Sequence, residues 1–77
     1  DVLSRIPQKQ REILVAIANE GKARALTGTK FIRKYSLGSA SSVQGAVKGL
    51  LKSDFIISEN NEWYVYDYFF GLWLQRN

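Results

Sequence analysis

Apolar residues recur at helical spacing three times within the first 53 residues. The first set shares one side of a helix that starts near Pro7, where proline suits an opening turn. This set consists of Ile6, Ile13, Leu14, Ile17 and Ala18. Ser4 is a candidate N-cap, and Gly21 can end the helix in a left-handed conformation. The pattern predicts an amphipathic helix up to about residue 20.

A second, shorter helix is predicted after a loop over residues 22–28. Ala25-Leu26 could form a short strand within that loop, and Thr27 or Thr29 could cap the helix. Its apolar stripe consists of Phe31, Ile32 and Tyr35. The outward positions of this helix are Lys30, Arg33 and Lys34.

The segment 36–39 predicts a tight turn into a third helix. Leu37 can fill the junction, Gly38 can adopt a positive φ, and Ser39 can cap the helix that follows. This helix runs from about Ala40 to Ser53. Its buried stripe is Val43, Ala46, Val47, Leu50 and Leu51. The opposite face is Ser41, Ser42, Gln44, Gly45, Lys48, Gly49 and Lys52.

Two of these outward positions are glycines inside the helix. Each costs about 1 kcal/mol relative to alanine. Either something approaches the helix closely at Gly45 and Gly49, or a well-packed helix tolerates them, and tolerance is the commoner case.

The periodicity changes from 3.6 to 2 after Asp54. The segments 55–59 and 62–66 flank Asn60-Asn61, a pair that suits a two-residue hairpin loop. In that register Glu59 faces Glu62, and both faces of the hairpin carry apolar residues. Asp67 can cap a last helix from Tyr68 to about Gln75. The apolar stripe of this helix is Phe69, Phe70, Trp73 and Leu74.

Three helices, a tight turn before the third, and a two-stranded hairpin are typical of a winged helix-turn-helix. The predicted fold class is therefore mainly α with a small β-hairpin: three helices, a two-stranded wing and a short C-terminal helix. In that fold the third helix enters the major groove of DNA, and the wing contacts the backbone or the minor groove.

Composition narrows the function classes. The 77 residues suffice for one domain, over 1–77, and contain no Cys, His or Met. Disulfides, thiolate zinc sites and imidazole catalysis are thereby excluded, and we expect no catalytic residue, no cofactor and no metal. Glu59 and Glu62 are expected at an exposed turn without a pocket. No apolar run approaches 18 residues, so we expect a cytoplasmic domain that does not contact a membrane.

The net charge of +4 is unevenly distributed. Residues 1–52 carry ten basic and three acidic side chains, a net +7, and residues 53–77 carry one basic and four acidic side chains, a net −3. A basic first part favours a polyanionic partner.

Three runs resemble a known family: 7–14 (PQKQREIL) with Ala16-Ile17-Ala18, 30–44 (KFIRKYSLGSASSVQ) and 62–74 (EWYVYDYFFGLWL). Together they are similar to the C-terminal winged-helix domain of prokaryotic, largely archaeal-type, AAA+/STAND-like ATPases, except that Tyr68 stands where the family often has proline. The resemblance implies a parent protein with an N-terminal nucleotide-binding domain, and a chain that begins at Asp1 fits a piece of a larger ATPase. Gly28-Thr29-Lys30 lacks the leading glycine and the spacing of a P-loop, so we expect no ATP binding here.

Duplex DNA binding is the first functional hypothesis. It uses the polar face of the third helix, with the cations of the second helix on phosphates. Its candidate residues are Ser41, Ser42, Gln44, Lys48, Lys52, Lys30, Arg33 and Lys34. Against it stand the acidic wing tip, the lack of arginine in the third helix, and the fact that such faces are usually only solvated.

Protein interaction is the second hypothesis, because the C-terminal third holds more aromatic residues than a small core needs. We expect Phe69, Phe70 and Trp73 to complete the core. The candidate interface is then Phe55, Ile57, Tyr64 and Tyr66. It would dock on the ATPase domain of the parent protein or on a second copy of the chain.

Overall fold

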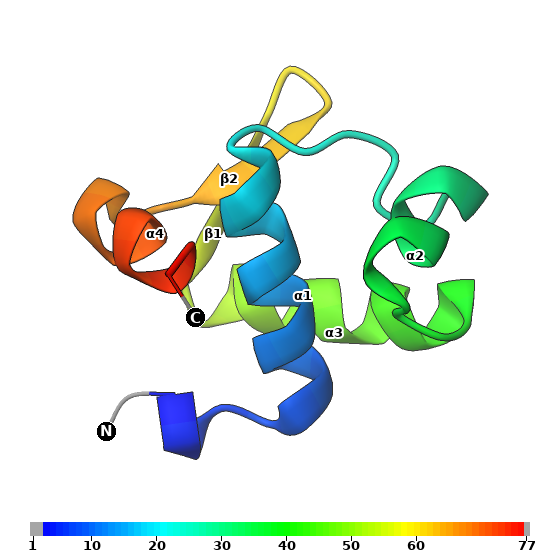
Figure 1. The fold of residues 1–77 in the computed structure, drawn as a ribbon, viewed down its shortest axis with the longest axis horizontal. Coiled ribbons are helices and arrows are strands. Elements are labelled where there is room, and N and C mark those ends of the chain that lie inside the picture. Colours follow the sequence, from blue (N-terminus) through cyan, green and yellow to red (C-terminus); the bar gives the residue numbers. More distant parts are fainter. Residues whose placement is uncertain (1–2, 77) are drawn as a thin grey trace.

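The computed structural model describes residues 3–76 and arranges them around one central helix (Figure 1). A 3-10 turn over Leu3–Arg5 leads into α1 (Gln8–Glu20), followed by α2 (Thr29–Tyr35) and α3 (Ala40–Lys52). The hairpin β1 (Ile56–Glu59) and β2 (Glu62–Val65) precedes α4 (Tyr68–Leu74). The predicted fold class, mainly helical with one antiparallel hairpin, is confirmed.

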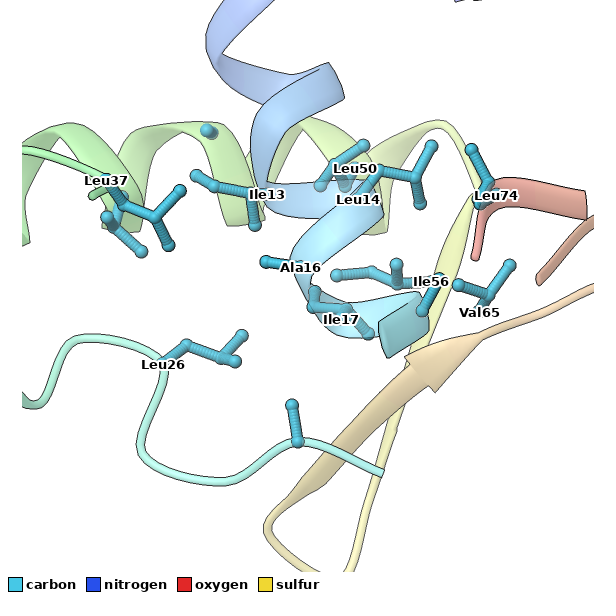
Figure 2. Packing of buried hydrophobic residues seen from close by; sticks show 14 of the residues in the cluster. Ile13, Leu14, Ala16, Ile17, Leu26, Leu37, Leu50, Ile56, Val65 and Leu74 are labelled. Carbon is cyan, nitrogen blue, oxygen red and sulfur yellow. The ribbon is translucent and has the colours of Figure 1, made fainter. Parts of the chain in front are cut away.

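The core forms where α1 packs against α3, α4 and β2 (Figure 2). Residues of α1 at helical spacing lie at its centre, completely shielded from solvent. The largest fully buried side chains are Ile13, Leu14, Ile17, Leu37, Val43, Leu50 and Leu74. The apolar stripes predicted for the first and third helices therefore face this interior.

Three of the residues predicted to cap or end a helix do so in the structure. Gly21 ends α1 at φ 78°, Ser39 Oγ accepts from the N–H of Ser42 at 3.2 Å, and Asp67 Oδ1 accepts from the N–H of Phe70 at 3.1 Å. Each group satisfies a backbone donor or acceptor that a helix end leaves unpaired.

Two other predicted caps are wrong. Pro7 occupies the N-cap of α1, and Ser4 lies in the preceding 3-10 turn. The N-cap of α2 is Gly28, not Thr27 or Thr29. The N–H of Gly28 donates to the carbonyl oxygen of Ala25 and closes a turn. A Cβ added to Gly28 would lie 3.1 Å from that oxygen, so position 28 favours glycine.

The hairpin has the predicted register. Ile56 pairs with Val65, Ile57 with Tyr64 and Glu59 with Glu62. Asn60 and Asn61 have φ values of 54° and 62°, the left-handed conformations that a two-residue type I′ loop requires.

A third extended segment joins this hairpin. The N–H of Ala23 donates to Trp63 O, and the N–H of Trp63 donates to Ala23 O, both at 2.8 Å. The predicted short strand at Ala25-Leu26 is wrong, because Ala25 has φ 50° and ends the extended pairing.

The two glycines of α3 lie in different surroundings. A Cβ on Gly45 would meet nothing within 4 Å, whereas one on Gly49 would clash with the side-chain amide of Gln10 on α1. Of the two glycines, Gly49 is therefore the one that another group approaches closely, and that group belongs to α1. Gly49 is not on the open face.

Alanine substitutions test this difference. We expect Gly45→Ala to raise the free energy of unfolding by about 1 kcal/mol, through helix propensity alone. Gly49→Ala should raise the free energy of unfolding by less, because the Gln10 side chain must move aside. Urea denaturation of both variants measures the effect, and an equal gain at both positions would contradict the α1 contact.

Candidate nucleic-acid interface

The turn between α2 and α3 is held by its own residues and by α1. Ser36 adopts φ 53° and Gly38 φ 87°, which reverses the chain. Leu37 is buried, and its carbonyl oxygen accepts a hydrogen bond of 2.9 Å from Nζ of Lys9 on α1. Lys9 also pairs with Glu12 at 3.2 Å. The start of α3 is therefore fixed by apolar packing and by a charged donor together.

The polar face predicted for α3 is open to solvent. Its exposed candidate side chains are Ser41, Ser42, Gln44, Lys48 and Lys52. At about 100° per residue, Ser41, Gln44, Lys48 and Lys52 fall within one arc of roughly 80°. Gly45 borders this arc, and Ser42 lies roughly 60° past Gly45. No side chain stands at Gly45, so a ligand can approach the backbone between this arc and Ser42.

The cations of α2 are not equally available. Lys30 and Arg33 are exposed and have no ion-pair partner among residues 3–76. Lys34 lies 2.7 Å from Oε2 of Glu20 and sits over the Tyr35 ring. The Tyr35 hydroxyl donates to the same carboxylate. Part of the charge of Lys34 is therefore already compensated.

The wing is short, and one of its two carboxylates is neutralised. A guanidinium nitrogen of Arg24 lies 2.9 Å from Oε2 of Glu62. Glu59 accepts a hydrogen bond of 3.2 Å from the Tyr64 hydroxyl. Because the hydroxyl is neutral, this contact does not compensate the charge of Glu59. Arg24 and Glu62 are 38 positions apart in the sequence. Only the bridge between Ala23 and Trp63 brings Arg24 to the wing tip. Local spacing gave no signal of this pair.

The order of elements, with a bridge residue between α1 and α2 and a hairpin after α3, agrees with comparison against known proteins. A family model described as "Probable winged helix domain" matches residues 1–76. The chain belongs to this winged-helix family. No curated protein and no solved structure matches the sequence.

The winged-helix domain has an aromatic surface where it was not predicted. Phe69 is largely exposed and does not complete the core, and Trp73 is about half exposed while stacked on Phe70 at 5.8 Å. The expectation is correct for Phe70, which packs against the core. The buried residues of α4 are Gly71 and Leu74.

The hairpin residues proposed as a protein interface are only partly accessible. Phe55 packs against the core and lies 6.3 Å from the Phe70 ring. Ile57 and Tyr64 are half-buried partners across the hairpin, and Tyr66 alone is well exposed. The open apolar surface of the winged-helix domain is therefore centred on α4.

Within residues 3–76 there is no group of three or more acidic side chains that could hold a metal ion. Over the same residues, no helix is long and apolar enough to cross a membrane.

The contact between Glu20 and Lys34 makes stability depend on pH. Hydrogen bonds from Lys34 and then Tyr35 hold the pKa of Glu20 below its usual value. Folding therefore favours the carboxylate, and this stabilisation is present above the pKa of the unfolded chain, about 4.3. It is lost as pH falls through the lower pKa of the folded state.

We expect Glu20→Gln to be less stable than the parent chain at neutral pH, with the difference closing below about pH 4. Thermal melts across this range measure it. Lys34→Gln removes the same pair from the other side and should show the same trend. If the stability difference between Glu20→Gln and the parent chain does not change with pH, the contact between Glu20 and Lys34 is not its source.

Proposed function

We propose that this winged-helix domain binds duplex DNA through the exposed face of α3, with few base-specific contacts. One observation carries the proposal: every outward-facing side chain in the arc of α3 is a hydroxyl, an amide or an ammonium group. The helix contains no carboxylate to repel phosphate. A surface of this chemistry suits the backbone and groove edges of DNA.

The residues of this face have distinct roles in the proposal. Gln44 has the two-ended amide that can pair with adenine, and Ser41 and Ser42 can donate to phosphates or base edges. Lys48 and Lys52 supply the salt-dependent attraction to phosphate. On α2, Lys30 and Arg33 add to it, whereas Lys34 contributes less because Glu20 already binds it.

The wing limits affinity. It ends in Glu59 and Glu62, and only Glu62 is paired with a cation, Arg24. A tip of this charge is repelled by phosphate. We therefore expect α3 to carry most of the binding energy, with the wing held away from the backbone.

Fluorescence anisotropy with a labelled duplex tests the proposal. If about four cations meet phosphates, the logarithm of affinity should fall with the logarithm of salt concentration with a slope of roughly −3 to −4. Lys48→Glu should weaken binding at low salt by about tenfold or more and make this slope shallower by at least about one.

Lys22→Glu is the matched control. It makes the same change of charge at an exposed residue beyond the end of α1, outside α3. Equal weakening by both variants would indicate a general charge effect and would overturn the assignment to α3. Absence of binding by the parent chain at low salt would overturn DNA binding altogether.

We also propose that the domain works in the cytoplasm as a module of a larger ATPase. The support is the resemblance of the runs 7–14, 30–44 and 62–74 to the winged-helix domain of AAA+/STAND-like ATPases. A P-loop encoded upstream of Asp1 in the same reading frame is the expected finding. A complete upstream sequence without one would contradict it.

A second candidate function is protein interaction, in a regulatory role or in oligomerisation. The observation that favours it is the exposed aromatic surface of α4. The ATPase domain of the parent protein is one possible occupant of that surface, and a second copy of the chain is the other.

A further inference from the structure

Every residue of α4 is apolar, aromatic or glycine, with the sequence YFFGLWL. A helix that is hydrophobic on all sides normally has all sides covered. In this domain the core covers only the side that carries Gly71 and Leu74. The opposite side of α4 is in contact with solvent.

The large exposed apolar side chains among residues 3–76 all lie on this helix or just before it. Their exposed fractions are 66% for Tyr66, 70% for Tyr68, 77% for Phe69, 39% for Leu72 and 45% for Trp73. Contiguous patches of this kind mark interaction surfaces on soluble proteins. We call these five residues the α4 patch.

A groove adjoins the α4 patch. It runs between the end of α1, strand β2 and α4, and has a volume of about 360 Å³. Aromatic and aliphatic side chains form most of its wall, including Tyr64, Tyr66, Tyr68 and Leu72. A closed apolar cavity of about 150 Å³ is enough to hold benzene, so this groove can receive an aromatic side chain.

We propose that the α4 patch is covered by the same patch of a second copy of this chain, in a two-fold symmetric dimer. The inference rests on protein interaction as the second candidate function and not on DNA binding. Phe69 and Trp73 project from the same helix that lines the groove with Tyr68 and Leu72. One chain therefore carries both the inserted side chains and the receiving groove, as a two-fold interface requires.

The available area is sufficient for self-association. With about 200 Å² for a large side chain, the exposed fractions of the five residues correspond to about 600 Å² on each copy. Two copies would bury about 1,200 Å², the lower end of the range for specific interfaces. A reversible dimer with micromolar affinity is expected, not a permanent one.

Charge favours an antiparallel arrangement of the two helices. Asp67 caps the start of α4 and Arg76 follows its end. If the helices cross antiparallel about a two-fold axis, Arg76 of each copy approaches Asp67 of the other. The helix dipoles then also oppose one another favourably. The α4 patch shares no residue with the polar face of α3, so the dimer would leave that face open.

Sedimentation equilibrium of the 77-residue chain over roughly 1–500 μM tests the proposal across the affinity range of such interfaces. We expect a concentration-dependent shift from monomer to dimer. Phe69→Ser should weaken dimerisation by at least about tenfold, because it removes the most exposed aromatic side chain of the α4 patch. Circular dichroism verifies that this variant is folded.

Ile57→Ser is the matched control, on the hairpin face that the sequence suggested as an interface. It should leave the dimer intact. A strict monomer over the whole range would overturn the proposal and point to a different partner for the α4 patch. Dimerisation unaffected by Phe69→Ser, or unlimited association beyond the dimer, would also overturn it. Anisotropy with DNA is a separate measurement, so failure of either proposal can be recognised independently.

Discussion

The burial of α1 is the constraint on which the rest of the structure depends. A chain of 77 residues encloses little volume, and α1 passes through the middle of it. Ile13, Leu14 and Ile17 have no exposed surface. Because α3, α4 and β2 all pack on this one helix, the position of each depends on its side chains.

The polar side of α1 sets the position of the proposed DNA-binding elements as well. Lys9 hydrogen-bonds to the turn before α3, Gln10 lies against Gly49 within α3, and Glu20 holds Lys34 of α2. These contacts come from the first turn and from the last residue of one helix. The surface proposed to bind nucleic acid is thus oriented by residues that themselves do not belong to it.

The domain presents two surfaces of opposite character. The polar face of α3 carries serine, glutamine and lysine, whereas the α4 patch carries tyrosine, phenylalanine, leucine and tryptophan. In Figure 1, α2 and α4 lie on opposite sides of α1. A close-packed core of this size has no room for further large rings. Aromatic residues beyond that capacity therefore remain at the surface, where they are available to a partner.

Several features were determined by local sequence. The stripes of the first and third helices, the Ser39 and Asp67 caps and the register around Asn60-Asn61 each depend on residues close together in the chain. Periodicity and turn chemistry act over this range, so they predicted the fold class and which side of α3 is polar. The winged-helix family agrees with that prediction.

Other features were decided only by tertiary structure. Arg24 reaches Glu62, Ala23 joins the hairpin and Gln10 meets Gly49 across separations that no local pattern encodes. The aromatic third shows the reason most clearly. Since α4 is apolar on every side, its periodicity cannot indicate which side is buried. The limited space beside α1 and Val65 decides it, by accepting Leu74 and the small Gly71 and leaving Phe69 in solvent.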